Sequence, residues 1–320
     1  MHCALKVVLI IIIVILLLVL ALALLIRLPR YYRLKERHAV KHYDRVYSEL
    51  PTFQDRHGKF GSHRYVITMS TIPDRIDLIG PTLASLFDQS IKVDEIVINV
   101  PLISRKGLTY QIPKWLAKLK HVTIHRVDKD EGPGTKLLPT LRREKPQTRI
   151  IVVDDDNIYH PKMIENIIYN FESRKCHTEQ IALTNYGFHF CHDGSLPPLK
   201  ERLRAIGAAA EDVDLLQGFS GFIVVPEFFP KAAYEIKDCP KECISVDDIW
   251  FTGWLHKNGV RVQSTGSIWS CLPIINFGKM RQTTCLAHGE NKDFVTDQIV
   301  INWFMKEHGY KPVLARNNKD

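Results

Sequence analysis

The stretch RIIVVDDD, residues Arg149–Asp156, decides the fold. The branched aliphatic residues before the acidic triplet are typical of a strand that is buried on both faces, as at the centre of a parallel sheet. Three adjacent carboxylates cannot be buried without partners, so we expect them at the C-terminal end of that strand, where α/β sheets bind ligands. Carboxylates at that edge can hold a hard divalent cation, which in turn holds phosphate oxygens. The alternative is an acidic turn that caps a helix, because Asp is a good N-cap residue.

Strand-like and helix-like segments alternate on both sides of this stretch. The expected strands are Tyr65–Thr68, Glu95–Val100, Val122–Val127, Ile150–Val153 and Ile181–Thr184. The expected helices are Leu78–Phe87, Trp115–Leu119, Lys136–Arg142, Pro161–Ser173, Ser245–His256 and Thr296–Glu307. Short links between them imply parallel pairing and an α/β sandwich. Between these segments, Tyr186–Asp212 predicts a loop with a short helix, and Val213–Val225 is apolar and broken by glycine.

Residues Val7 to Ile26 form a run of 20 apolar residues without a charge. At about 1.5 Å per residue such a helix spans the roughly 30 Å hydrocarbon core of a bilayer, so we expect a single-pass anchor. A cleaved signal peptide stays open, because Ala21–Ala23 resembles a cleavage site. The expected order is a short tail at 1–6, the anchor at 7–26, a basic stem at 27–62, one large α/β domain at 63–313 and a tail at 314–320.

The net charge of +8 is unevenly spread. Residues 1–45 hold eight Lys or Arg against two acidic residues, so +6 of the charge lies there and only +2 on the rest of the chain. A basic segment beside an anchor suits the anionic headgroups of lipids. The large domain has no corresponding basic excess, so nucleic acid is not an expected partner.

Two signals conflict over the side of the membrane on which the domain lies. Six basic residues follow the anchor by residue 41 and only Lys6 precedes it, which favours a cytoplasmic domain by the positive-inside rule. The domain also holds six cysteines in three close sequence pairs, which suits disulfides in an oxidising lumen, although free buried cysteines are equally ordinary. These cysteines are Cys176, Cys191, Cys239, Cys243, Cys271 and Cys285.

Two motifs have the chemistry of phosphate contacts. Thr71-Ile72-Pro73-Asp74-Arg75 follows the first expected strand and so faces the ligand crevice, where Arg75 can contact a diphosphate. The alternative is a Pro-Asp turn with an exposed arginine. Gly132-Pro133-Gly134-Thr135-Lys136 leads into a helix whose N-terminus suits an anion, and Lys136 adds a point charge. The spacing is not that of the phosphate loop of nucleotide hydrolases, and an ordinary glycine turn is the alternative.

A glycine pair and an acidic pair are further candidates for the site. Gly218 and Gly221 allow the backbone to approach a ligand closely, or else mark a bulged strand. Ser245 is expected to cap a helix with Asp247 and Asp248 in its first turn, where the dipole favours the ionised form and thus a general base; dipole compensation alone is the alternative.

His288 lies in the polar segment Leu286–Asn291 near the C-terminus. It can complete a metal site, because imidazole is a common ligand, but a surface histidine is the more frequent outcome.

Taken together, these motifs resemble those of the GT-A fold, DXD-type glycosyltransferases. The matching pieces are Val66–Arg75, Gly132–Lys136, the DXD-like Asp154–Asp156, Gln217–Gly221 and Asp247–Asp248. The resemblance implies a Rossmann-like, mixed or mostly parallel sheet flanked by helices, a nucleoside-diphosphate sugar as donor, and Mn²⁺ or Mg²⁺ as cofactor. It implies that Asp154 lies near the ribose or the metal and that Asp156 binds the metal directly. The candidate metal ligands are then Asp154 and Asp156, together with His288 from its residue type. The donor-binding set is then Thr71, Pro73, Arg75, Lys136, Asp154, Asp155, Gly218 and Gly221.

The function implied by the resemblance is metal-dependent transfer of a hexosyl or pentosyl group to an acceptor hydroxyl on a glycan, protein or lipid. Asp248 would act as the base, with Asp247 as the fallback, in a domain facing the Golgi lumen; a cytoplasmic domain stays open. Two alternatives remain. One is a nucleotidyltransferase or phosphotransferase on a similar sheet, and the other is an inactive, membrane-tethered sugar-binding protein.

Overall fold

The computed structural model describes residues 2–58, 60, 62–174, 180–205, 210–266, 274–275 and 294–316. The strands of the main sheet are β1 Tyr65–Ser70, β2 Glu95–Pro101, β3 Val122–Val127, β4 Arg149–Val152, β6 Ile181–Thr184, β9 Phe222–Val224 and β10 Arg261–Ser264. Two small sheets pair β5 Asn157–Ile158 with β11 Ile274–Ile275 and β7 Gly187–Phe188 with β8 Leu215–Leu216.

The α-helices are α1 His2–Glu49, α2 Phe53–His57, α3 Gly80–Phe87, α4 Lys114–Ala117, α5 Leu138–Arg143, α6 Met163–Arg174, α7 Leu199–Arg204, α8 Asp247–Lys257, α11 Val295–His308 and α12 Val313–Arg316. Short 3₁₀ helices are η1 Gly132–Lys136, η2 Gly218–Ser220, η3 Pro226–Phe228, η4 Lys231–Tyr234 and η5 Lys241–Ser245.

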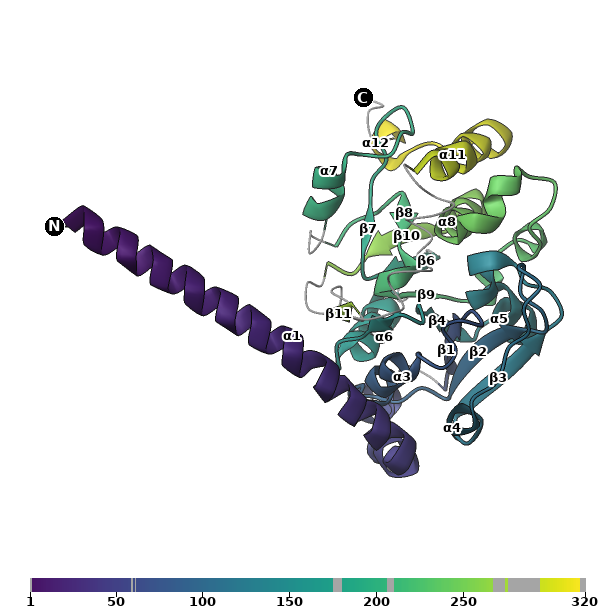
Figure 1. The fold of residues 1–320 in the computed structure, drawn as a ribbon. Coiled ribbons are helices and arrows are strands. Elements are labelled where there is room, and N and C mark those ends of the chain that lie inside the picture. Colours follow the sequence, from purple (N-terminus) through teal and green to yellow (C-terminus); the bar gives the residue numbers. More distant parts are fainter. Residues whose placement is uncertain are drawn as a thin grey trace.

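The main sheet has seven strands in the order β10-β6-β9-β4-β1-β2-β3 (Figure 1). Neighbouring strands pair in parallel except at β9, which runs antiparallel to both β4 and β6. All five strands expected from the sequence form part of this sheet, and the expected mixed, mostly parallel α/β sheet flanked by helices is confirmed. The sequence reasoning missed β9 and β10.

Helices cover both faces of the sheet. On one face Thr68 of β1 contacts Thr140 of α5, and Phe222 of β9 packs against Phe251 of α8. On the other face Tyr65 of β1 reaches Glu172 of α6. Both faces of the central strands are therefore buried, which explains why β4 reads as an unbroken apolar run.

The strand that delivers the acidic triplet is fixed at its other end by a buried ion pair. Arg149 is fully buried and donates from Nε to Glu172 at 2.8 Å. The hydroxyl of Tyr65 donates to the same carboxylate at 3.2 Å. A charge this deep needs such partners, and the pair ties β1, β4 and α6 together at the N-terminal edge of the sheet.

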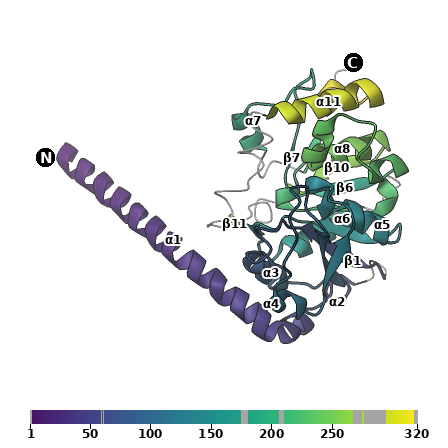
Figure 2. The same ribbon diagram turned by 45° about the vertical axis from the view of Figure 1, so that its right-hand side comes forward.

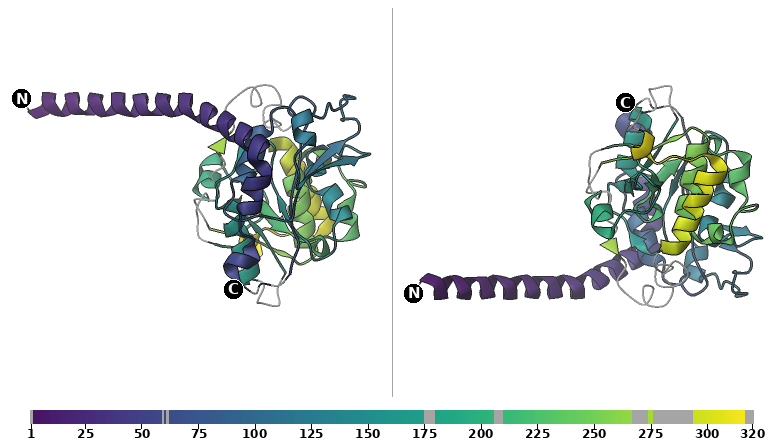
Figure 3. Two further views of the ribbon diagram at one scale, coloured as in Figure 1. Left: turned by 90° about the horizontal axis from the view of Figure 1, so that it is seen from below. Right: turned by 90° about the horizontal axis from the view of Figure 1, so that it is seen from above.

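Helix α1 is both the candidate anchor and part of the packed domain. Residues Lys6–Ala23 are apolar and exposed, with a mean hydropathy of 3.4, so the helix is long and apolar enough to cross a membrane; a signal sequence has the same features. Figure 3 shows the straight N-terminal part projecting from the domain and the helix then turning onto it.

The second part of α1 belongs to the hydrophobic core rather than to a loose stem. Ala39, Tyr43 and Tyr47 are buried. The Tyr47 ring stacks on His121 at 4.7 Å, and its hydroxyl donates to the carbonyl of Val93. The stretch interpreted as a charged stem is therefore helical up to Glu49, and its last turns cover α3.

We predict that Tyr47→Ala destabilises the full-length protein by about 3 kcal/mol or more, because it removes a buried aromatic ring and leaves a cavity. Thermal unfolding in detergent measures the change. Leu34→Ala on the same helix is the control, since that side chain is exposed. Equal melting temperatures for the two variants would contradict the packing of α1 onto the domain.

Candidate active site

The loops that follow β1 and β4 meet at the C-terminal edge of the sheet. Because the two strands pair in parallel, Thr71–Arg75 and Asp154–Asp156 emerge side by side. Two clusters of ion pairs form there. We call them the lysine cluster, which comprises Lys136, Asp154, Asp247 and Asp248, and the arginine cluster, which comprises Arg75, Asp155 and Asp156.

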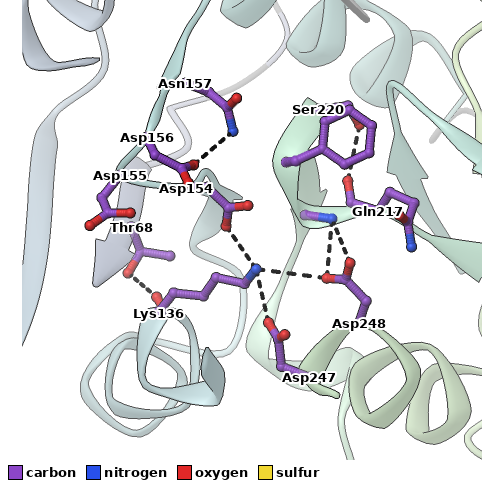
Figure 4. Close-up of polar contacts among 12 residues, drawn as sticks. Thr68, Lys136, Asp154, Asp155, Asp156, Asn157, Gln217, Ser220, Asp247 and Asp248 are labelled. Carbon is purple, nitrogen blue, oxygen red and sulfur yellow. Dashed lines mark hydrogen bonds and ion pairs between the residues drawn. The ribbon is translucent and has the colours of Figure 1, made fainter. Parts of the chain in front are cut away.

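The lysine cluster joins three segments that are far apart in the sequence (Figure 4). The ammonium group of Lys136 lies 2.9 Å from a carboxylate oxygen of Asp154 and 2.9 Å from one of Asp247. It lies 3.7 Å from Asp248. Three carboxylates thus surround one cation, and the cluster carries an excess of negative charge when all of them are ionised.

Charge within the lysine cluster is set by burial and by the neighbours. Burial lowers the pKa of Lys136, but the carboxylates around it outweigh that effect and hold the pKa well above its ordinary value. Burial raises the pKa of Asp248 to about 8, and the charges of Asp247 and Asp154 act in the same direction. Lys136 and the N–H of Gly218 oppose that rise without cancelling it.

This result corrects the expectation that the helix dipole keeps Asp248 readily ionised. Asp247 and Asp248 do occupy the first turn of α8, as predicted. The predicted cap is wrong, because Val246 is the N-cap and no side chain caps the helix, while Ser245 ends the preceding η5. Desolvation of the Asp248 carboxyl raises its pKa by more than the N-terminus of α8 lowers it.

A buried network of hydrogen bonds holds the backbone of Lys136 and so positions its side chain beside the carboxylates. Its backbone carbonyl accepts a hydrogen bond of 2.6 Å from the hydroxyl of Thr68. The amide of Asn99 donates to the hydroxyls of Thr68 and Thr140, at 3.1 and 2.9 Å. Strands β1 and β2 thus hold the loop by its main chain. Sequence reasoning missed this support because isolated Thr and Asn residues in strands give no recognisable motif.

The arginine cluster lies on the other side of the acidic triplet. Arg75 donates to Asp156 at 2.9 Å and lies 3.3 Å from Asp155. Asp155 is buried, and burial raises its pKa to about 6, with the charge of Arg75 opposing and that of Asp156 adding to the rise. Asp155 therefore neutralises Arg75 inside the protein, while Asp156 stands at the surface of the site.

The loop that carries Arg75 is a tight turn. The N–H groups of Arg75 and Ile76 both bond the carbonyl of Ile72, at 2.9 and 3.1 Å. Pro73 is half-buried in that turn, and Thr71 is buried, with its carbonyl accepting a hydrogen bond from Tyr110. In this structure Thr71 and Pro73 shape the loop that positions Arg75, whereas their predicted contact with a donor stays a prediction.

Gly218 brings its backbone directly against the lysine cluster. Its N–H donates to both carboxylate oxygens of Asp248 at 3.1 Å. A Cβ at this position would lie 2.4 Å from the ammonium of Lys136 and 2.8 Å from Asp248. Gly221 has a different reason to be glycine, since it adopts φ +87°, in the left-handed region.

We predict that Gly218→Ala displaces the ammonium of Lys136 or the carboxylate of Asp248 and lowers activity by about tenfold or more, as misplacement of a reacting group by about 1 Å does. The measurement is the rate of transfer at saturating donor. Gly259→Ala is the control for replacing a glycine away from the cluster: nothing lies within 4 Å of a Cβ there, and its φ of +75° makes the change cost about 1–2 kcal/mol of stability without touching the site. Equal rates for both variants would show that the cluster tolerates a methyl group.

Tyr159 is a part of the site that the sequence reasoning missed. Its hydroxyl accepts from the backbone N–H of Asp154 at 2.8 Å and donates to the carbonyl of Phe219 at 3.2 Å. One buried side chain therefore joins the acidic triplet to the Gly218 segment. Its place three residues after the triplet was the available signal, but an aromatic residue there is more often core.

The carboxylates that can receive a divalent cation are the two at the edges of the triplet. Asp154 and Asp156 keep 29% and 40% of their side chains exposed, against 4% for Asp155. Within the described ranges, no group of three His, Cys, Asp or Glu side chains is arranged to hold a metal ion by itself. One or two carboxylates completed by substrate phosphates are, however, the usual ligands of Mg²⁺. His288, the third candidate ligand, lies outside the described residues.

Three of the six cysteines of the domain lie within the described residues. Cys191, Cys239 and Cys243 are free thiols, and the last of these is buried. Burial raises the pKa of Cys243 far above its usual range. The local bridge expected for the pair Cys239 and Cys243 is therefore absent from this structure. Cys176, Cys271 and Cys285 lie outside the described residues, so the other two pairs are not tested.

Comparison with known proteins gives likeness at the level of structure. No protein-family model and no curated protein matches the chain. Among solved structures, a mannosyltransferase from Pyrobaculum calidifontis in complex with GDP-Man and Mn²⁺ shares 13% identity, with a TM-score of 0.46 over 80% of this chain and 69% of that one.

Two other similar structures are GalNAc-T7 with UDP, GalNAc and Mn²⁺ and TarS from S. aureus. They share 12% and 14% identity, with TM-scores of 0.43 and 0.38. The matches cover 63% and 62% of this chain, but only 42% and 57% of those chains. At these identities and scores the likenesses do not by themselves assign a function to this chain.

Proposed function

We propose that the protein is a membrane-anchored glycosyltransferase that transfers a sugar from a nucleoside-diphosphate sugar to an acceptor hydroxyl. The observation that carries the proposal is the lysine cluster, in which one ammonium group links Asp154, at the end of a central parallel strand, to the carboxylates of α8. Lys136, whose charge can neutralise a diphosphate, thereby lies directly against Asp247 and Asp248, the two candidate bases.

Donor binding is assigned to the groups at the edge of the sheet. Arg75 and Lys136 bring positive charge to the place where a diphosphate would lie, and each is now held by carboxylates. Mn²⁺ or Mg²⁺ fits the two exposed carboxylates Asp154 and Asp156, and when bound it would neutralise charge on the leaving diphosphate. Asp155 acts indirectly, because it orients Arg75 from beneath.

Proton transfer is assigned to Asp248, with Asp247 as the alternative. Asp248 has a pKa raised to about 8, close to the operating range of a general base, and Gly218 holds its carboxylate from the backbone. Asp247 is less exposed and lies nearer to Lys136. Asp248 is therefore the better placed of the two to accept a proton from an acceptor hydroxyl.

The experiment that tests the metal site is transfer or donor hydrolysis with and without Mn²⁺. We predict that chelation and Asp156→Ala each lower the rate by about 10²-fold or more, the loss expected when charge stabilisation of a leaving group is removed. Asp44→Ala is the control, because Asp44, near the C-terminal end of α1, forms an exposed ion pair with Lys120 and lies outside both clusters. Full activity after chelation and in Asp156→Ala would contradict the assignment.

The domain is proposed to face the Golgi lumen. Folded domains can override the flanking charge, and the spacing of the two cysteine pairs other than Cys239 and Cys243 suits local bridges. Protease protection on sealed microsomes tests the topology. A domain that is digested without detergent would place it in the cytoplasm.

A further inference from the structure

One exposed face of the domain combines apolar and basic side chains. Leu199 and Val295 each expose 61% of their surface, and Phe294 exposes 40%. The guanidinium of Arg202 lies 4.2 Å from the centroid of the Phe294 ring, so α7 and the start of α11 form one surface. We call it the α7 patch, and it consists of Leu199, Lys200, Arg202, Arg204, Phe294 and Val295.

The charge of the α7 patch is predominantly positive. Lys200 and Arg204 are exposed, and Arg202 is half-buried. Glu201 is the one acidic residue of α7. Apolar side chains rimmed by Lys and Arg are the composition of segments that lie in the interfacial region of a bilayer, where the basic groups meet anionic headgroups.

The position of the α7 patch also indicates a membrane. Figures 1 and 2 show α7 on the side of the domain that faces the N-terminal half of α1. The apolar run ends at Ile26, and Ala39, 13 residues later, is already buried in the core of the domain. A helix of that length spans only about 20 Å, so a bilayer around the apolar half of α1 would lie close to this face.

The α7 patch is connected to the candidate active site. The hydroxyl of Tyr186 donates to the backbone carbonyl of Arg202 at 2.8 Å. The ring of Tyr186 packs on that of Phe219, with 5.5 Å between centroids. Phe219 directly follows Gly218, which binds Asp248. The patch therefore adjoins the Gly218–Phe219 segment of the site.

We propose that the α7 patch is a second membrane contact, which seats the domain on the surface of the bilayer that α1 crosses. Its apolar residues enter the headgroup region, and its basic residues bind lipid phosphates. The Gly218–Phe219 side of the site then faces the lipid surface, so that acceptors carried by the same membrane reach Asp248 from that side. The proposal rests on α1 being retained as an anchor, as proposed above.

The test places a photo-crosslinking residue, p-benzoylphenylalanine, at Leu199 or at Val295 of the full-length protein in vesicles of phosphatidylcholine and phosphatidylserine. Ile103 is the matched control, because it is 56% exposed and lies beyond β2, away from α7. We expect lipid adducts at Leu199 and Val295 and only background at Ile103. In the double variant Lys200→Glu and Arg204→Glu, we expect adducts at Leu199 to fall by about fivefold or more, because each basic residue near an anionic surface strengthens binding by about that factor.

Alkaline carbonate extraction separates failure of the anchor from failure of the patch. If carbonate releases the protein, α1 is not an anchor and both proposals fall. If the protein resists extraction but Leu199 and Val295 give no more lipid adduct than Ile103, the anchor stands and the α7 patch does not contact the membrane. Adducts to a protein in place of lipid, in membranes prepared from cells, would likewise overturn the assignment to a lipid surface.

Discussion

Asp248→Asn is expected to lower turnover by about 10²-fold or more while leaving donor affinity unchanged, because loss of a general base affects proton transfer and not the binding of the diphosphate. Steady-state kinetics combined with calorimetric titration of the nucleoside diphosphate measures both quantities. Asp247→Asn is the matched variant on the same helix turn. If it loses turnover and Asp248→Asn does not, the two roles are exchanged. If neither loses turnover, no dedicated base operates.

The pH dependence of the wild type gives a second readout of the same residue. Burial raises the pKa of Asp248 to about 8, so the carboxyl is protonated below that pH and can accept a proton only above it. We therefore expect kcat/KM to rise with pH up to about 8. A carboxyl with a raised folded pKa costs stability as the pH rises from the unfolded pKa to the folded one. Asp248→Asn should accordingly melt no lower than the wild type at neutral pH.

Lys136→Met is expected to have the largest effect on the protein as a whole. It removes the cation that three carboxylates share, and breaking a buried ion pair costs about 3–5 kcal/mol because the remaining charge is left uncompensated. We expect lower stability and loss of nucleoside-diphosphate binding together. Chemical denaturation and calorimetric titration measure the two effects.

The control for Lys136→Met is Lys120→Met. Lys120 is 71% exposed and pairs with Asp44 at the surface, where such pairs contribute little. We expect nearly wild-type stability and binding in this variant. If Lys136→Met unfolds at the same denaturant concentration as Lys120→Met and still binds the nucleotide, then the lysine cluster is not the centre of the donor site.

Periodicity and composition were enough to predict the parallel half of the fold. Ile150–Val153 is an unbroken apolar run, and Glu95–Val100 is apolar except for Glu95 and Asn99. Such short, nearly continuous apolar runs are typical of strands that are buried on both faces, as both are here. The antiparallel strand β9 was missed, because Phe222–Val224 is short and directly follows the Gly218–Gly221 turn. Its pairing with β4 and β6 is a long-range contact that no local pattern encodes.

The second part of α1 was mistaken for a stem for a related reason. The charges of residues 27–45 dominate its composition, whereas the residues that pack on the domain, Ala39, Tyr43 and Tyr47, are few. Two of these are tyrosines, whose polar hydroxyls weaken an apolar stripe. Helical spacing of four residues between them was the signal that could have revealed the contact.

The sequence predicted which residues gather at the candidate site, but not which ion pairs they form with one another. Sequence position at strand ends placed Arg75, Lys136 and the acidic triplet at one edge of the sheet, and the structure brings them together there. The partners could not be foreseen. That Lys136 joins Asp154 to Asp247 and Asp248 depends on where α8 packs, and the raised pKa of Asp248 depends on burial in the assembled cleft.

The most direct measurement of the central claim is identification of the nucleotide released from a panel of nucleotide sugars, with an acceptor mixture and Mn²⁺ present. The account predicts a nucleoside diphosphate together with a glycosylated acceptor, and loss of both products in Asp156→Ala. Release of pyrophosphate would contradict it in favour of a nucleotidyltransferase. Binding of a nucleotide sugar without any transfer, unchanged in Asp248→Asn, would contradict it in favour of a sugar-binding protein.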